Sequence, residues 1–260
     1  MDRSKMANSY RTIFISDVHL GTRGCKAKFL ADFLKFNDCE NLFLVGDIID
    51  GWRMKQGIYW PQEHSNVVRR VLTKAKRGTK ITWIAGNHDE FLRKFLDYKI
   101  KLGNIDLADE YIYTTLDGRE FLIIHGDSFD GIVKYHKWLA YLGDHAYSLL
   151  LHLNTVFNFI RHKFGLNYWS LSSYLKQKAK QALNFIYEFE NAVAHECHRR
   201  GFDGVVCGHI HHAEMKQIGG ILYCNDGDWV ESCTALVEHF DGSLEIVKWD
   251  KVTNEDTSSN

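Results

Sequence analysis

The stretch RTIFISDVHL, residues 11–20, decides the fold that we expect for this chain. An apolar run of strand length, Thr12–Ser16, leads directly into Asp17 and His19, which are two positions apart. Residues two apart along a strand face the same side, so we expect both side chains to point the same way. A carboxylate and an imidazole that point together can hold one metal ion. The stretch therefore predicts a buried strand that delivers metal ligands at its carboxyl end.

Short apolar runs of this kind recur along the chain, and each ends in polar or glycine-rich residues. They predict strands at Thr12–Ser16, Asn41–Val45, Lys80–Ala85, Glu120–Ile124, Asp203–Cys207, Ile221–Cys224, Ala235–Phe240 and Leu244–Trp249. Apolar residues at helical spacing predict helices at Lys26–Phe36 and Glu63–Arg77. The alternation favours a layered fold of strands and helices. The strands from Ile221 onward are expected to close this fold as an antiparallel meander.

Four more motifs follow predicted strands and carry the same residue types as the first. They are Gly46-Asp47-Ile48-Ile49-Asp50, Gly86-Asn87-His88-Asp89, His125-Gly126-Asp127 and Gly208-His209-Ile210-His211. Loops at the carboxyl ends of strands converge in layered αβ folds, so these side chains can surround a site for two metal ions. A carboxylate such as Asp47 can bridge the two ions. Mixed nitrogen and oxygen ligands suit manganese, iron or zinc better than calcium or magnesium.

Each motif also has an ordinary explanation when it is taken alone. Asp-x-His is often a surface pair, Gly-Asp-x-x-Asp can cap a helix, and Gly-Asn-His-Asp can form a turn. The occurrence of all five motifs, each after an apolar strand, favours the metal site over these explanations. We expect other polar residues of these segments to support loops and turns or to lie at the surface: Asp50, Asp127, His212, Asp226 and Asp228.

The composition excludes several classes of protein. The 260 residues carry 32 Lys and Arg against 33 Asp and Glu, and the net charge of −1 excludes a globally basic nucleic-acid coat. Six cysteines without a Cys-x-x-Cys pair, and no secretory signal before the first strand, predict a reducing, cytoplasmic setting. The chain has no run of about 18 apolar residues, so no membrane-spanning helix is expected.

Residues 130–200 break the alternation, because the pattern there is helical and aromatic and contains no strand signal. Basic side chains dominate the middle of this segment, where Asp144 is the only acidic residue between Lys134 and Gln181. We expect a helical insertion or lid over the core. A strongly basic segment in a nearly neutral chain suits an anionic substrate or surface.

Three roles of this insertion stay open. It can pack on the core with a solvated basic face. It can form a substrate lid, in which Trp169 and its aromatic neighbours hold an apolar group while lysines meet phosphate: Lys163, Lys176 and Lys180. It can also lie on an anionic membrane surface, which would place the protein on the inner face of the membrane.

Taken together, the five motifs resemble those of the calcineurin-like metallophosphoesterase superfamily, and the match runs from about Ile13 to Trp249. The resemblance implies an α+β fold, a four-layer αββα sandwich. Residues 1–260 would form one domain, with the insertion at residues 130–200 inside it. The resemblance also implies two divalent metal ions, manganese first, with iron or zinc as alternatives.

The resemblance assigns roles to individual residues. It implies that the first ion is bound by Asp17, His19, Asp47 and His211, and the second by Asp47, Asn87, His125 and His209, with Asp47 as the bridge. By the same resemblance, His88 is the catalytic histidine that assists the leaving oxygen, and Asp89 orients it. Asn87 and His88 are also expected to contact the substrate.

Within the superfamily the chain is similar to the UDP-2,3-diacylglucosamine pyrophosphatase branch of lipid A synthesis, above all in ISDVHLG, residues 15–21, and LVGDIIDGW, residues 44–52. That branch typically has arginine where this chain has His88, and GHTHRP where it reads GHIHHA at residues 208–213. The resemblance implies that a metal-activated hydroxide cleaves a pyrophosphate or phosphodiester bond in a nucleotide lipid of this type. The alternatives are another metallophosphoesterase, acting on a nucleotide, a phosphoprotein or nucleic acid, and a non-catalytic scaffold. The charge balance weighs against nucleic acid as a partner.

Overall fold

The computed structural model describes residues 8–98, 104–131 and 171–249. The chain divides into two compact units, of which the first is Met1–Ser128 with Val193–Asn260 and the second is Phe129–Ala192. The first unit contains every strand among the described residues and every predicted metal ligand. In the second unit the described part consists mainly of the first turns of helix α5 (Leu171–Arg199), which continues into the first unit.

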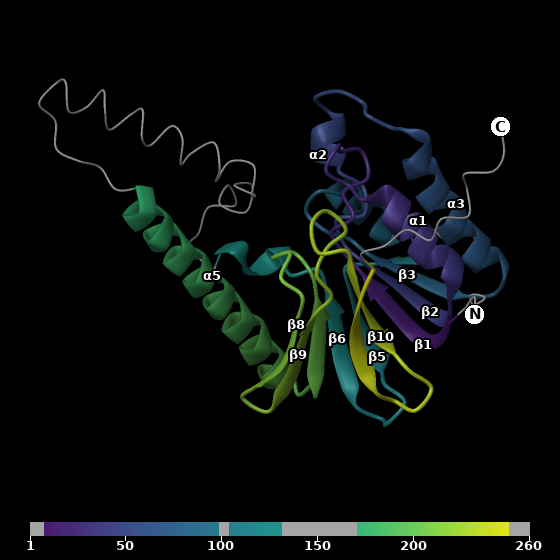
Figure 1. The fold of residues 1–260 in the computed structure, drawn as a ribbon. Coiled ribbons are helices and arrows are strands. Elements are labelled where there is room, and N and C mark those ends of the chain that lie inside the picture. Colours follow the sequence, from purple (N-terminus) through teal and green to yellow (C-terminus); the bar gives the residue numbers. More distant parts are fainter. Residues whose placement is uncertain (1–7, 99–103, 132–170, 250–260) are drawn as a thin grey trace, which may run out of the picture. The chain divides into compact units, whose positions relative to one another are not determined.

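A six-stranded mixed sheet forms one layer of the first unit (Figure 1). Its strands, in spatial order, are β11 (Leu244–Lys248), β10 (Thr234–Glu238), β1 (Asn8–Ile15), β2 (Asn37–Val45), β3 (Lys80–Ile84) and β4 (Ile105–Ala108). Strands β1 to β4 are parallel, whereas β10 and β11 extend the β1 side in antiparallel pairing. The carboxyl ends of β1, β2 and β3 therefore lie at one edge of the sheet.

A five-stranded mixed sheet forms the second layer. Its order is β5 (Glu110–Thr114), β6 (Glu120–Ile124), β7 (Gly204–Cys207), β9 (Ile221–Asn225) and β8 (Glu214–Ile218). The central strands β6, β7 and β9 are parallel, and the two outer strands pair with them in antiparallel fashion. The carboxyl ends of the three central strands again share one edge.

Helices cover the outer face of the six-stranded sheet. The amphipathic helices α1 (Ala27–Phe36) and α3 (Gln62–Lys76) contribute Leu30, Phe33 and Val67 to a core that also contains Ile13 and Leu42 from the sheet. Leu30, Phe33, Ile13 and Leu42 have no exposed surface. Burial of each such apolar side chain stabilises the fold by roughly 1.5–3 kcal/mol relative to exposure.

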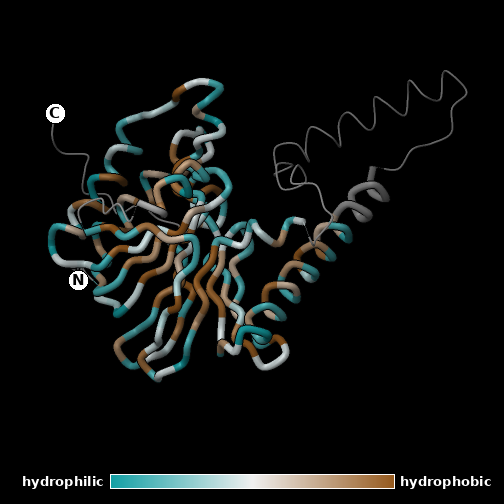
Figure 2. Tube along the Cα trace, turned by 180° about the vertical axis from the view of Figure 1, so that it is seen from behind, coloured by the Kyte–Doolittle hydropathy of each residue, from teal (hydrophilic) through white to brown (hydrophobic). Residues whose placement is uncertain are grey.

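The two sheets pack face to face through a second core. Phe14 and Phe43, from neighbouring strands of one sheet, stack with ring centroids 5.1 Å apart, and Tyr113 of the other sheet meets Phe14 edge-on at 5.6 Å. Figure 2 shows hydrophobic residues gathered along the strands of both sheets. This core confirms the predicted α+β sandwich with helices outside the sheets.

The predicted strands all occur, with boundaries that differ by a few residues, and three strands were not predicted. The missed strands β4, β5 and β8 lie at sheet edges, and β5 and β8 carry few buried side chains. Edge strands face solvent, so their sequences lack a strong apolar pattern. The predicted antiparallel meander after Ile221 is confirmed for β10 and β11 and is wrong for β9. β9 belongs to the five-stranded sheet, and the loop after it carries the chain to β10 of the other sheet.

The predicted insertion at residues 130–200 is helical wherever it is described. Helix α5 covers Leu171–Arg199, and residues 132–170 lie outside the described residues. Val193, Ala194 and Cys197, in the last turns of α5, are buried within the first unit, and the Cys197 thiol lies 3.1 Å from the Gly204 carbonyl of β7. No helix in the described part of the chain combines the length and the hydropathy that a bilayer span requires.

Candidate metal centre

The five predicted motifs follow β1, β2, β3, β6 and β7, whose carboxyl ends the two sheets bring to one edge. Backbone hydrogen bonds continue between the loops beyond the strands. The His19 amide donates to the Asp47 carbonyl at 2.9 Å, and the Gly208 amide donates to the His125 carbonyl at 3.2 Å. The parallel pairing thus holds the loops together before any side chain contributes.

Five of the predicted metal ligands adopt a left-handed backbone conformation, which is strained for residues other than glycine. Their φ angles are 49° for Asp17, 53° for His19, 54° for Asp47, 71° for His209 and 54° for His211. In the described part of the chain, only Cys233 among the other non-glycine residues shares a positive φ. The expected strand geometry of Asp17 and His19 is therefore wrong, because β1 ends at Ile15 and both ligands lie in the loop.

Glycines next to the ligands allow the loops to approach closely. A Cβ atom at Gly208 would collide with the side chains of Ser16 and Asp17, and one at Gly86 would collide with Asp47. A substitution at either glycine therefore displaces a predicted ligand or the loop that carries it.

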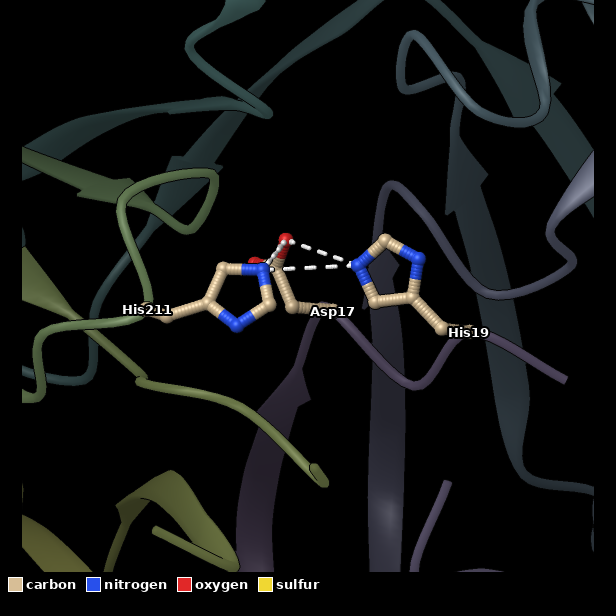
Figure 3. A group of neighbouring side chains, drawn as sticks. All are labelled: Asp17, His19 and His211. Atoms are coloured by element: carbon tan, nitrogen blue, oxygen red, sulfur yellow. Dashed lines mark hydrogen bonds and ion pairs between the residues drawn. The ribbon is translucent and has the colours of Figure 1, made fainter. Parts of the chain in front are cut away.

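Asp17, His19 and His211 form the first cluster (Figure 3). Asp17 Oδ1 lies 3.1 Å from His211 Nε2 and 3.8 Å from His19 Nε2, and the two imidazole nitrogens are 3.4 Å apart. The second carboxylate oxygen accepts a hydrogen bond from the His209 amide at 2.7 Å and one from the Ser16 hydroxyl at 2.6 Å. One oxygen is thus fixed by the loops while Oδ1, which is buried, has no hydrogen-bond partner.

Asp47, His125 and His209 form the second cluster. Asp47 Oδ2 lies 3.3 Å from His125 Nε2, and Asp47 Oδ1 accepts the His88 amide at 2.8 Å. His125 lies with Nδ1 2.9 Å from the Val45 carbonyl. Because a carbonyl only accepts, Nδ1 carries the proton there, and Nε2 is the atom that can bind a cation.

Asp47 also faces the first cluster, since its Oδ2 lies 3.9 Å from His19 Nε2. It is therefore the carboxylate that connects the two clusters. Asn87 is buried beside them, and neither the oxygen nor the nitrogen of its side-chain amide has a hydrogen-bond partner. A buried amide without partners is costly, and its oxygen is a ligand type that divalent ions accept.

The carboxylates and imidazoles of the site shift one another's pKa values. Burial opposes a charge on His19, but neighbouring carboxylates, led by Asp17 and Asp50, outweigh it and raise the pKa of His19 to about 10. Burial opposes ionisation of Asp47, but His125 outweighs it and lowers the pKa of Asp47 to about 2. Burial likewise opposes protonation of His125 and His211, and carboxylates still raise both pKa values. The carboxylates of the site thus favour a positive charge on these imidazoles.

This donor set fits two divalent cations. It offers imidazole nitrogens, carboxylate oxygens and an amide oxygen in two adjacent groups, and that mixture suits manganese, iron or zinc. Orphaned atoms of Asp17, Asn87 and His125 point to a missing partner with positive charge. Such a cation would replace the protons that the carboxylates otherwise attract.

His88 lies next to these clusters, with Nε2 4.0 Å from Asp47 Oδ2. Its Nδ1 is 3.0 Å from Asp50 Oδ1, and the other oxygen of Asp50 is 3.3 Å from His19 Nδ1. Asp50 thus contacts both imidazoles, as expected for a residue that supports ligands rather than binds metal. These interactions outweigh burial and lower the pKa of Asp50.

The expected role of Asp89 needs correction. Its carboxylate accepts hydrogen bonds from the Gly86 amide at 2.6 Å, the Ile48 amide at 2.9 Å and the Trp83 indole at 3.2 Å. None of these partners is His88. Asp89 holds the loops after β2 and β3 together, and the carboxylate beside the His88 imidazole is that of Asp50.

Comparison with known proteins agrees with this geometry. Residues 10–213 match the model of the calcineurin-like phosphoesterase family. The chain belongs to this family. As a member it is a hydrolase of the phosphoesterase class, and divalent metal ions are typical of the family.

Several proteins are similar to this phosphoesterase. A UDP-2,3-diacylglucosamine hydrolase of Aliivibrio fischeri is 27% identical over 243 residues, which cover 86% of this chain and 92% of that protein. A DNA polymerase II small subunit of Methanothermobacter thermautotrophicus is 29% identical over 169 residues, which cover 51% of this chain and 33% of the subunit. The solved structure of an archaeal phosphodiesterase aligns with 91% of this chain and 98% of its own at 13% identity and a TM-score of 0.46.

The other predicted residues of this phosphoesterase have different positions. Lys163 and Trp169 lie outside the described residues, as does the side chain of Lys176, and Lys180 is exposed on α5. Among the supporting residues, Asp127 pairs with Arg93 at 3.0 Å, and Asp228 accepts amide hydrogen bonds from the turn that follows it. His212 lies 3.5 Å from Glu214 at the surface.

Two contacts at the site were not expected from the sequence. The Ser16 hydroxyl forms hydrogen bonds with Asp17 and with Asp226, the second at 2.5 Å. Asp226 therefore contacts the first cluster through Ser16 and is not only a turn residue. Burial raises the pKa of Asp226. The Trp52 ring lies against His88 with centroids 4.4 Å apart. In the sequence, Trp52 ends the LVGDIIDGW stretch, two residues after Asp50, but nothing there points to a contact with His88.

Proposed function

We propose that this phosphoesterase cleaves a pyrophosphate or phosphodiester bond at a centre of two divalent metal ions, manganese first. The observation that carries the proposal is the pair of clusters, in which buried Asp17 and buried Asp47 each lie with two imidazoles, and Asp47 faces both clusters. Bound ions would activate a water as the nucleophile and neutralise charge on the phosphate oxygens.

The side chains divide the remaining work. Asp17, His19 and His211 would hold one ion, and His125, His209 and Asn87 would hold the other, while Asp47 would contribute to both. His88 has only 23% of its side chain exposed and directs Nε2 toward the cluster side, where it can give a proton to the leaving oxygen. Asp50, at 3.0 Å from Nδ1, stabilises the protonated imidazole that this step requires.

For the substrate we propose a nucleotide lipid of the UDP-2,3-diacylglucosamine type, as in lipid A synthesis. The support is the similarity to UDP-2,3-diacylglucosamine hydrolases along most of both chains. The proposal includes a lid or membrane contact by the insertion and a cytoplasmic location at the inner membrane face. The insertion residues that would make these contacts lie mostly outside the described residues.

The test is a substrate panel with Mn²⁺ and purified protein. The panel contains UDP-2,3-diacylglucosamine, UDP-glucosamine without acyl chains, and bis-p-nitrophenyl phosphate. We expect hydrolysis of the lipid nucleotide with the largest kcat/KM, and no hydrolysis by the Asp47→Ala variant or after chelation. Equal kcat/KM for the acylated and unacylated nucleotides would contradict the lipid substrate, and metal-independent hydrolysis would contradict the metal centre.

A second candidate is cleavage of phosphodiester bonds in nucleic acid. The similarity to a DNA polymerase II small subunit favours it, although this chain spans only a third of that protein and has a net charge of −1. Single-stranded and double-stranded DNA therefore belong in the same panel. Faster Mn²⁺-dependent cleavage of DNA than of the lipid nucleotide would favour this candidate.

A further inference from the structure

Trp52 lies in the short helix α2 (Gly51–Met54) that follows the second motif, and its indole packs on His88. The ring centroids are 4.4 Å apart and the ring planes are inclined by 36°. About a third of the Trp52 side chain is exposed, at 38%, so the indole lies on the solvent side of the site. The contact joins a residue without an assigned role to the residue proposed to assist the leaving group.

The backbone of α2 is fixed to the loop of His88. The Gly51 amide donates to the His88 carbonyl at 2.9 Å, and a Cβ at Gly51 would stand only 2.9 Å from that same oxygen. Asp50 caps the helix by accepting the Arg53 amide at 2.7 Å. Because Asp50 also contacts the His88 imidazole, the position of Trp52 follows from contacts that already hold His88.

The indole is also fixed at its polar edge. Trp52 Nε1 donates to Glu90 Oε1 at 3.2 Å, and Glu90 begins the 3-10 helix η1 (Glu90–Tyr98) only two residues after His88. A hydrogen bond at the ring edge, together with packing on the ring face, restricts the orientation of the indole plane. Trp52 is therefore held by the same loop against which it packs.

The imidazole of His88 needs such support. Its close polar contact is that of Nδ1 with Asp50 at 3.0 Å, and that contact lacks regular hydrogen-bond geometry. A ring held at a single atom can still turn about that contact. The His19 ring meets the imidazole edge-on, with centroids 4.6 Å apart, and Trp52 supplies the second ring against which it packs.

We propose that Trp52 is a positioning residue, whose indole keeps the His88 imidazole in the plane that directs Nε2 toward the metal clusters. This inference rests on the proposed function, because it concerns the residue that assists the leaving group. Trp52 acts through His88 and binds neither metal nor phosphate. An error of orientation at a group that transfers a proton lowers the rate of the chemical step without weakening substrate binding.

The test compares Trp52→Leu and Trp52→Phe with the wild type. Phe240→Leu serves as a matched control, because Phe240 is exposed at the turn between β10 and β11, at the opposite end of the sandwich. We expect Trp52→Leu to lower kcat about tenfold, with KM within about twofold and unchanged metal content. Trp52→Phe is expected to recover most of the loss, and the control to keep wild-type values.

A second measurement does not depend on activity. The sample is zinc-loaded protein with labelled histidine. Nuclear Overhauser effects between the His88 and His19 rings report whether the His88 imidazole keeps its orientation. The His88 resonances are assigned as those that disappear in His88→Gln. We expect these effects in the wild type and in Trp52→Phe, and their loss in Trp52→Leu.

Several results would overturn the inference. If the ring contacts persist in Trp52→Leu, the indole does not position His88. A rise in KM with unchanged kcat would make Trp52 a substrate contact, and a loss of zinc would make it part of the metal site. If the wild type hydrolyses no phosphoester, the proposed function fails, yet the ring contacts still decide whether Trp52 orients His88.

Discussion

Strand β1 leads to two carboxylate clusters that differ in one respect. Within the strand, where Glu238 of β10 pairs with Thr12, Glu238 accepts hydrogen bonds from Arg11 and the Leu116 amide, each at 2.7 Å, and also contacts Thr12 and Tyr113. Beyond the end of the strand, buried atoms of Asp17, Asn87 and His125 have no hydrogen-bond partner. The first cluster is satisfied within the protein, whereas the second contains buried polar atoms that a cation could satisfy.

The backbone shows the same contrast. Around Glu238 the chain is regular strand, paired in register with β1 and β11. At the other end, five predicted ligands occupy the left-handed region, a conformation that costs of order 1–3 kcal/mol for each residue. Buried polar groups that satisfy one another stabilise a fold, whereas strain and orphaned groups persist where a ligand compensates for them. The contrast therefore separates a structural end of the sandwich from a functional one.

The largest effect should follow substitution of the residue that connects the two metal clusters. Asp47→Ala removes a ligand from both proposed ions, so we expect kcat/KM to fall by more than about 100-fold. Loss of a shared ligand should exceed the effect of changing residues that only hydrogen-bond to metal ligands, which is about 10- to 100-fold. Metal content, measured by mass spectrometry of the purified protein, should fall as well. Glu238→Gln is the matched control, because it changes a buried carboxylate at the other end. Full metal content and near-normal turnover in Asp47→Ala would remove the distinction between the two ends.

The opposite cluster should respond in stability rather than in activity. Glu238→Ala leaves the Arg11 guanidinium, which is partly buried, without its carboxylate. We expect the free energy of unfolding to fall by about 3 kcal/mol, at the low end for broken buried pairs because Arg11 retains some contact with water. Urea titration followed by circular dichroism measures the change. The folded fraction should still bind metal, and a loss of metal affinity without a loss of stability would contradict the assignment of this end.

A smaller effect should identify the carboxylate that serves His88. Asp50→Asn keeps a cap for α2 but weakens the contacts with both imidazoles, and we expect kcat to fall about 10- to 100-fold while the protein stays folded. Asp89→Asn should instead lower the melting temperature, because Asp89 accepts hydrogen bonds that join two loops. The reverse pattern, in which Asp89→Asn lowers kcat at full stability, would restore the role first expected for Asp89.

The sequence was sufficient for the core of the fold and for the residues that meet at the sheet edge. Runs such as Asn41–Val45 are apolar because both faces of their strands are buried, and that signal is local. The convergence of Asp17 and Asp47 follows from the rule that parallel strands end at the same edge, and the packing of the second sheet on the first brings His125 to them. In both cases a short-range pattern combines with one general rule of topology.

Other features depend on contacts that no local pattern encodes. Edge strand β8 alternates between half-buried and exposed side chains, so its pairing is visible only once β9 is in place. The partner of His88 is Asp50 rather than Asp89 because the Asp89 carboxylate is occupied by the Gly86 and Ile48 amides, contacts that form only once the two loops meet. Trp52 lies in the LVGDIIDGW stretch, but its contact with His88, thirty-six positions away in the sequence, is visible only in the structure.

The finest test of the contrast is the dependence of metal affinity on pH. In the metal-free chain, carboxylates raise the pKa of His19 to about 10, so its imidazole keeps a proton at neutral pH. A cation must displace that proton, and the affinity should therefore rise about tenfold for each pH unit and each displaced proton from pH 6 to 9. With an ordinary pKa of about 6.5, the affinity would level off above pH 7. Calorimetric titration with Zn²⁺ in buffers of different ionisation enthalpy counts the protons directly.

The same shift fixes the sign of a stability change in the metal-free chain. A group whose pKa is raised on folding stabilises the fold fully below its unfolded value, near 6.5 for histidine, and this contribution is lost as the pH rises through the folded value of about 10. The melting temperature of metal-free protein should therefore fall between pH 7 and pH 10, and bound metal should abolish the fall because it replaces the proton. Asp47 does not contribute to this change, because its pKa of about 2 keeps it ionised throughout. A melting temperature of metal-free protein that does not change between pH 7 and pH 10 would show that the imidazoles are neutral there. The predicted metal ligands would then hold their positions without bound protons.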